Sequence, residues 1–116
     1  MCTLSGLTVF DFQQKDWKNE SSTGYSSEGY GVFGESTFVP LFGKSGLLLV
    51  LGGDSPPNQT FFYEQGAALV DMSNITVYDI YTHQWYHQTA TGDIPQGRSE
   101  FCMVGAQGLD NSSYEL

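Results

Sequence analysis

Three observations predict an all-β fold for this chain. Aromatic residues make up 15% of its 116 residues, and aromatic side chains suit the pleated, half-buried surface of a sheet. The chain contains 14 glycines, as expected of a fold with many turns, but only 4 prolines. Sustained helical spacing of apolar residues is hard to find along the sequence. We therefore expect an ordered protein built from strands and turns.

A segment near the N-terminus is repeated 68 residues later without a gap. Residues 7–21 match residues 75–89, and eight of the fifteen positions are identical or chemically alike. The identical pairs are Thr8 and Thr76, Val9 and Val77, Asp11 and Asp79, and Trp17 and Trp85. Self-similarity at a fixed spacing indicates one supersecondary unit that occurs more than once.

Each copy of this repeat predicts a hairpin of two strands. Residues 75–80 are nearly all β-branched or aromatic, which favours a strand packed on both faces. Asp79 follows at the start of a turn, where its carboxylate can bond to the backbone. Trp85 then opens the return strand, and its large ring could seal a junction with a neighbouring sheet.

Two further strands are expected between the copies. Residues 35–41 predict one strand, which Pro40 and Gly43 end. Residues 46–51 form a continuous apolar run, which is typical of a strand buried on both faces. Gly52 and Gly53 close this run and would allow a sharp exit and a close approach of backbone. One period of the repeat therefore contains four strands.

These elements resemble the kelch repeat of β-propellers. A buried strand ending in Gly-Gly is followed by a strand ending in an aromatic residue and Asp, and then by Trp six residues later. The residues of these motifs are similar to those of the extracellular kelch proteins of filamentous fungi, in the superfamily that includes galactose oxidase. The residues that carry the resemblance are Gly52, Gly53, Tyr78, Asp79 and Trp85, with Phe10, Asp11 and Trp17 in the preceding copy and Arg98 at the start of a blade.

The resemblance implies a partial propeller in three parts. Residues 1–21 would be the second half of one blade, 22–91 a complete blade, and 92–116 the start of the next. The spacing of 68 residues exceeds the roughly 50 residues of a kelch repeat. We place the excess in an inserted loop at 54–72. One position departs from the pattern: the arginine at the start of a blade matches Arg98, but the position 68 residues earlier is occupied by Tyr30. Because blades cover one another's faces, we expect this chain to be a fragment with marginal stability alone.

Charge and glycosylation motifs constrain location and partners. The chain carries 4 Lys and Arg against 13 Asp and Glu, so it lacks the cationic cluster that a nucleic-acid or anionic membrane surface requires. All four asparagines begin an Asn-x-Ser/Thr triplet, an outcome on the order of one in a thousand by chance. They are Asn19, Asn58, Asn74 and Asn111. We expect N-glycosylation and a secreted or cell-surface location, with any membrane attachment through segments outside this chain.

No catalytic residue, metal site or cofactor is predicted. His83 and His87 are the only histidines, and on a hairpin they need not converge on a metal. This shortage of ligands disfavours a copper radical oxidase, an enzyme class that shares the propeller fold. Cys2 and Cys102 are predicted to be two buried thiols, although a disulfide between them stays open.

The sequence favours a non-catalytic scaffold for protein or glycan partners. The candidate binding surface is the inserted loop, where Phe61, Phe62 and Tyr63 are adjacent. These aromatic residues would either contact a partner or pack against the top of the blade. One alternative is a fragment of a carbohydrate-active propeller oxidase whose catalytic residues lie outside this segment. An intracellular kelch adaptor is another.

Overall fold

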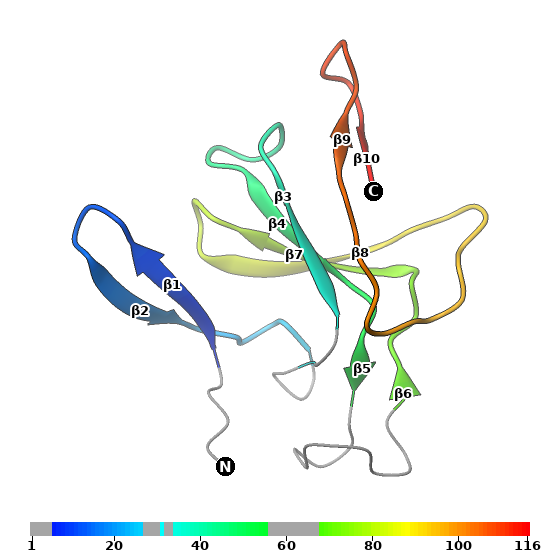
Figure 1. Cartoon of the computed structure of the whole chain (residues 1–116), viewed down its shortest axis with the longest axis horizontal. Coiled ribbons are helices and arrows are strands. Elements are labelled where there is room, and N and C mark those ends of the chain that lie inside the picture. Colours follow the sequence, from blue (N-terminus) through cyan, green and yellow to red (C-terminus); the bar gives the residue numbers. More distant parts are fainter. Residues whose placement is uncertain (1–5, 27–30, 32–33, 56–67) are drawn as a thin grey trace.

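The computed structural model describes residues 6–26, 31, 34–55 and 68–116. All the regular secondary structure within these residues is β-strand, so the all-β prediction is confirmed (Figure 1). The strands are β1 (Leu7–Asp11), β2 (Asp16–Glu20), β3 (Glu35–Val39), β4 (Leu47–Leu51), β5 (Asp54–Ser55), β6 (Ala68–Leu69), β7 (Asn74–Asp79), β8 (Gln84–Thr89), β9 (Ala106–Gln107) and β10 (Tyr114–Glu115).

A four-stranded antiparallel sheet forms the centre of the described chain. Its strands lie in the order β3, β4, β7 and β8. The spatial order of the strands in this sheet is therefore the same as their order in the sequence. The short ribbon of β5 and β6 lies between β4 and β7 in the sequence. The register aligns Leu48 with Tyr78 and Tyr78 with Trp85, which places all three on one face of the sheet. This meander of four strands is compatible with one propeller blade.

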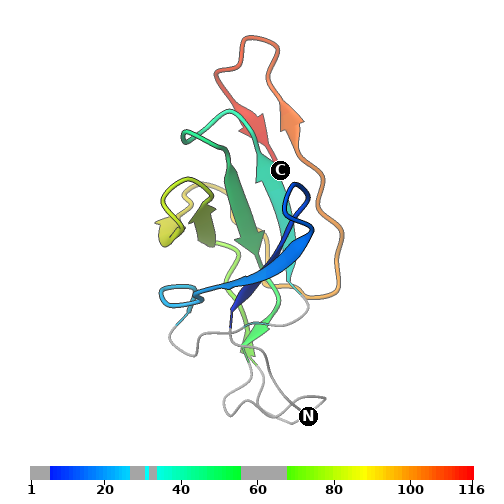
Figure 2. The ribbon, with the colours of Figure 1, turned by 90° about the vertical axis from the view of Figure 1, so that its left-hand side faces the viewer.

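Two separate hairpins flank the central sheet. One pairs β1 with β2, and the other pairs β9 with β10. In Figure 1 the β1–β2 hairpin lies on the left and the β9–β10 hairpin projects at the top. The turned view in Figure 2 shows a thin molecule with the β9–β10 hairpin again projecting. The overall extents of 46 × 43 × 21 Å agree with a flat, open arrangement.

The buried apolar core of the described residues is small. It consists of Val39, Leu51, Val77 and Tyr78. The prediction that residues 46–51 form a strand buried on both faces is wrong for most of that strand, because Leu47 to Val50 are only half-buried. The physical reason is that neither face of β4 is fully covered, since Leu47 and Leu49 lie on one face of the sheet and Leu48 and Val50 on the other. The predicted strand 35–41 is also shorter than expected, since β3 ends at Val39 and Pro40 begins a turn.

Gly52 and Gly53 end β4 at a close approach of backbone. Both glycines are buried and have positive φ angles, of 62° and 87°. The Gly53 N–H donates to the Arg98 carbonyl over 2.9 Å. A Cβ atom at Gly52 would lie 2.8 Å from that same carbonyl oxygen and 2.7 Å from the ring of Phe101. Side chains larger than hydrogen are therefore excluded from position 52 by both conformation and space.

Cys102 departs from its prediction. Its side chain is exposed, so the expectation of a buried thiol is wrong at this position. It follows the segment that contacts Gly52, in a stretch without a covering element among the described residues. Cys2 lies outside the described residues, and the question of its pairing stays open.

Candidate functional site

The two copies of the sequence repeat adopt the same aromatic geometry. In the first hairpin Phe10 pairs with Trp17 across β1 and β2, with ring centroids 4.9 Å apart and planes inclined by 53°. In the second hairpin Tyr78 pairs with Trp85 across β7 and β8, at 4.8 Å and 50°. Tilted ring pairs at such distances are favourable beyond their buried area. The repeat in sequence is thus a repeat in structure.

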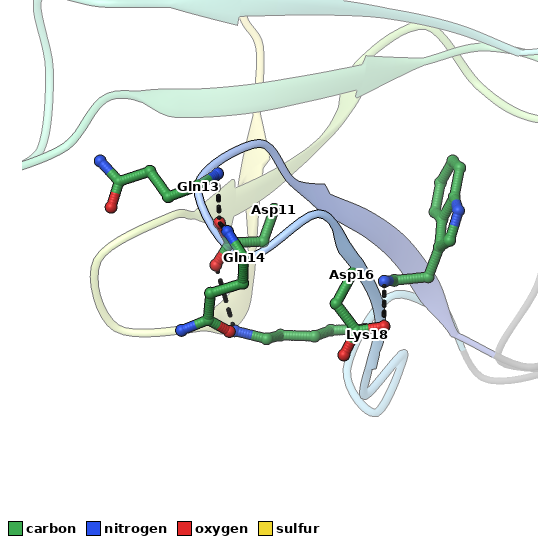
Figure 3. Close-up of polar contacts among 6 residues, drawn as sticks. Asp11, Gln13, Gln14, Asp16 and Lys18 are labelled. Carbon is green, nitrogen blue, oxygen red and sulfur yellow. Dashed lines mark hydrogen bonds and ion pairs between the residues drawn. The ribbon is translucent and has the colours of Figure 1, made fainter.

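The turn of the first hairpin is organised by one carboxylate. Asp11 Oδ1 accepts hydrogen bonds from the Gln13 N–H over 2.9 Å and from the Gln14 N–H over 3.0 Å (Figure 3). Lys18 Nζ lies 3.3 Å from Asp11 Oδ2. The Gln14 N–H contributes most to lowering the pKa of Asp11, and Lys18 adds to it. Lys15 closes the turn with φ of 54°.

The turn of the second hairpin repeats this arrangement. Asp79 Oδ1 accepts from the Tyr81 N–H over 2.8 Å and from the Thr82 N–H over 3.2 Å. His83 has φ of 58° and occupies the position of the left-handed residue in the first turn. The expectation that an aspartate bonds to the backbone at the start of the turn therefore agrees with both copies.

Strand β8 binds the linker that precedes the central sheet. Trp85 Nε1 donates to the carbonyl of Ser21 over 2.9 Å, and its ring lies 5.0 Å from that of Tyr25. His87 Nε2 lies 2.7 Å from the carbonyl of Gly24. Since a carbonyl only accepts, Nε2 carries the proton in this bond. We call residues 21–25, held in this way, the junction linker.

A histidine connects the two hairpins. His83 Nδ1 lies 3.1 Å from the hydroxyl of Tyr78 and 3.5 Å from Oε2 of Glu20 at the end of β2. Burial is the main cause that raises the pKa of Tyr78, and the Glu20 carboxylate raises it further. The contact joins the end of the first hairpin to the turn of the second.

The equivalent tryptophans differ in cover. Trp17 is 66% exposed, whereas Trp85 is half-buried. The difference follows from the junction linker, which packs on Trp85 and has no counterpart over Trp17 among the described residues. Phe12, whose ring lies beside that of Phe10, is 85% exposed. The first hairpin thus exposes its tryptophan, whereas the junction linker partly covers the equivalent tryptophan of the second hairpin.

The opposite face of the central sheet forms an apolar groove of about 590 Å³. Its floor includes Val39, Leu47, Leu49 and Val77, which the strand registers place on one face. Tyr114 of β10 lies at its margin and donates its hydroxyl proton to the Phe38 carbonyl over 3.0 Å. The third hairpin therefore attaches to the edge strand β3.

The other predicted site residues are dispersed. Arg98 is exposed and donates from Nε to the Gln96 carbonyl over 3.3 Å. Three of the predicted glycosylation sites, Asn19, Asn74 and Asn111, are exposed. The fourth, Asn58, and the predicted binding loop of Phe61, Phe62 and Tyr63 lie outside the described residues.

Residues able to bind a metal are not gathered within the described chain. In residues 6–26, 31, 34–55 and 68–116, no group of three or more His, Cys, Asp or Glu side chains could hold a metal ion. His83 and His87 bond to different partners, Tyr78 and Gly24 respectively. The same residues include no helix long and apolar enough to span a membrane.

Sequence reasoning missed the partners of the repeat. The junction linker and Glu20 were not singled out, although Tyr25 is the one aromatic residue within that linker. An aromatic residue in a stretch of Ser, Thr and Gly was a usable signal for a packing contact. The sequence also contains no signal for the contact between Tyr114 and the edge strand β3.

One comparison with known proteins bears on these features. The chain is 32% identical over 106 residues to a kelch repeat-containing protein of Arthroderma benhamiae. The kelch-repeat resemblance is confirmed. The match covers 86% of this chain and 14% of the relative, so the chain spans about a seventh of that protein. No protein-family model matches the kelch-like chain, and no solved structure matches it significantly.

The turn of the first kelch-like hairpin should weaken in acid. The lowered pKa of Asp11 means that its bonds stabilise the folded turn at pH values above the ordinary pKa of an aspartate. This contribution should be lost as pH falls through the lowered pKa. We expect protection of the Gln14 amide against hydrogen exchange to decline over that acidic range. Asp11→Asn should remove the pH dependence, and an unchanged titration in this variant would contradict the assignment.

Proposed function

We propose that the chain supplies one complete blade and parts of two neighbours to a kelch propeller that acts as a non-catalytic interaction scaffold. We further propose that the propeller belongs to a secreted or cell-surface protein with a protein or glycan partner. The observation that supports this most is the repeated hairpin, in which ring geometry, carboxylate bonds and the left-handed turn residue all recur 68 residues apart.

The junction linker supports radial repetition of the hairpins. A propeller buries each blade against the next, and isolated blades cannot cover their own faces. Here the junction linker lies against Trp85, and Glu20 at the end of the first hairpin lies 3.5 Å from His83 in the turn between β7 and β8. The apolar groove on the other face is the surface that a following blade would cover, and β9 and β10 would begin that blade.

The polar side chains described above bond to the protein's own backbone, which supports a role as a scaffold rather than an enzyme. Asp11 and Asp79 hold turns, and His87 and Trp85 hold the junction linker. Each of these groups is bonded within the protein and thereby stabilises the conformation of the repeated hairpin or of its linker. In propellers, loops that project from the rim commonly supply the partner contacts, and the inserted loop at 54–72 is the candidate for this role.

Binding measurements with the complete chain test the scaffold proposal. Immobilised chain would be exposed to chitin, β-glucan and mannan oligosaccharides and to a fraction of secreted fungal proteins. We expect saturable binding to one of these probes. Replacing Phe61, Phe62 and Tyr63 together by alanine should weaken it by tenfold or more, about 1.4 kcal/mol, because aromatic anchors dominate many interfaces.

Phe12→Ala is the matched control, since it removes an aromatic side chain that is 85% exposed and lies on the first hairpin. It should leave binding unchanged. Equal loss in the control and the loop variant, or no binding to any probe, would count against the proposal. Release of hydrogen peroxide from galactose by the copper-supplemented full-length protein would favour an oxidase instead.

A further inference from the structure

We propose that Asn111, in the turn between β9 and β10, is an acceptor for an N-linked glycan. Asn111, Ser112 and Ser113 form the acceptor triplet Asn-x-Ser. All three side chains are exposed. The inference depends on entry of the chain into the secretory pathway and is independent of scaffold binding.

The turn that carries Asn111 projects from the rest of the chain. Both views show the β9–β10 hairpin extending beyond the central sheet (Figures 1 and 2). Leu109 in the same turn is fully exposed, which shows that no described element packs over this tip. A bulky hydrophilic oligosaccharide could therefore be accommodated without displacing a strand.

Local bonds present Asn111 in a fixed backbone conformation. Its φ is 59°, and its N–H donates to the Gly108 carbonyl over 3.0 Å. The Gly108 N–H in turn donates to the Ser113 carbonyl over 2.9 Å, which closes the turn. The Asn111 side chain accepts a hydrogen bond from Gln107 Nε2 through Oδ1. This bond uses the oxygen of the carboxamide and does not occupy Nδ2, the atom to which a glycan is attached.

The other two described triplets lie closer to packed surfaces. Asn74 lines a small cavity together with Tyr25 of the junction linker, and Thr76 of its triplet lies 3.4 Å from His87 Nδ1. Asn19 corresponds in the repeat to His87, the residue that contacts the Gly24 carbonyl. Asn19 therefore stands where a preceding linker would pack. Asn111 has no such constraint among the described residues.

In the transfer reaction, a lipid-linked oligosaccharide diphosphate donates its oligosaccharide to Asn111. The bond between the anomeric carbon and the diphosphate oxygen breaks, and the lipid diphosphate leaves with the bonding electrons. The anomeric carbon forms a bond to Asn111 Nδ2, which loses one proton. The host transferase supplies catalysis, and this chain supplies the acceptor.

Site mapping on the secreted chain tests the proposal. The full chain would be directed into the secretory pathway of a eukaryotic host behind a cleavable leader. Enzymatic release of glycans in heavy-oxygen water would mark each formerly glycosylated asparagine as a labelled aspartate. We expect the label at position 111 in the wild-type chain.

Three variants make the mapping specific. N111Q and S113A each destroy the acceptor triplet and should remove one and the same glycan from the secreted chain. S112A is the matched control, because it alters the same turn but leaves the triplet intact, and its label at position 111 should persist. Secreted wild-type chain with an unmodified Asn111 would overturn the proposal, whatever the state of the other asparagines.

Discussion

Replacing Trp85 by alanine should destabilise the chain by about 3 kcal/mol, toward the lower end of the range for large aromatic truncations. The substitution removes the ring contacts with Tyr78 and Tyr25 and the bond to the Ser21 carbonyl. A loss of this size is a large fraction of the stability of any small domain. The junction linker should detach from β8 as a result. Urea unfolding followed by circular dichroism would measure the loss.

Trp17→Ala is the matched control, because it alters the equivalent position of the first hairpin. Trp17 contacts Phe10 but is 66% exposed, so its loss should cost about 1 kcal/mol or less. Trp85→Phe keeps a ring and removes the bond to Ser21, with an expected cost of about 1 kcal/mol. Equal destabilisation by Trp85→Ala and Trp17→Ala would show that the junction linker does not distinguish the two hairpins.

Gly52→Ala, which adds a single methyl group, should be strongly destabilising, with a loss of about 2–5 kcal/mol. A left-handed backbone costs a non-glycine residue roughly 1–2 kcal/mol, and overpacking adds about 1–3 kcal/mol. The added Cβ would lie 2.8 Å from the Arg98 carbonyl oxygen, an atom fixed by its bond to Gly53. The thermal unfolding midpoint of the variant would report the loss.

Gly92→Ala separates the two causes. Gly92 also has a positive φ, of 106°, but a Cβ built there meets no atom within 4 Å. Its replacement should cost only the backbone strain, about 1–2 kcal/mol. If Gly52→Ala were no worse than Gly92→Ala, the close approach of β4 to the segment around Arg98 would be refuted.

The repeat and the strands between its copies could be predicted from sequence because local chemistry determines them. The β-branched and aromatic residues of 75–80 favour a strand, and Asp79 at its end determines the turn. These strand and turn preferences do not depend on contacts with residues distant in the sequence. The matching ring pairs of the two hairpins follow from the constant spacing of Phe10, Trp17, Tyr78 and Trp85.

Burial and long-range contacts could not be predicted in the same way. Leu47 to Val50 are apolar enough for a strand covered on both faces, yet exposure depends on whether another sheet lies beside them. Cys102 is exposed for a comparable reason. The bond between Trp85 and Ser21 joins residues 64 positions apart, and no local pattern specifies that pairing. The candidate binding loop at Phe61 to Tyr63 stays a prediction.

The central claim is that two Trp hairpins are successive copies of one packed unit, and nuclear Overhauser contacts measured on this chain by NMR test it most directly. The account predicts ring contacts between Phe10 and Trp17 and between Tyr78 and Trp85. It also predicts that the Tyr25 ring contacts Trp85 and not Trp17. It also predicts strand chemical shifts for Leu47 to Leu51. Helical shifts in that run, or a Trp85 ring without contacts to Tyr78 and Tyr25, would contradict the account.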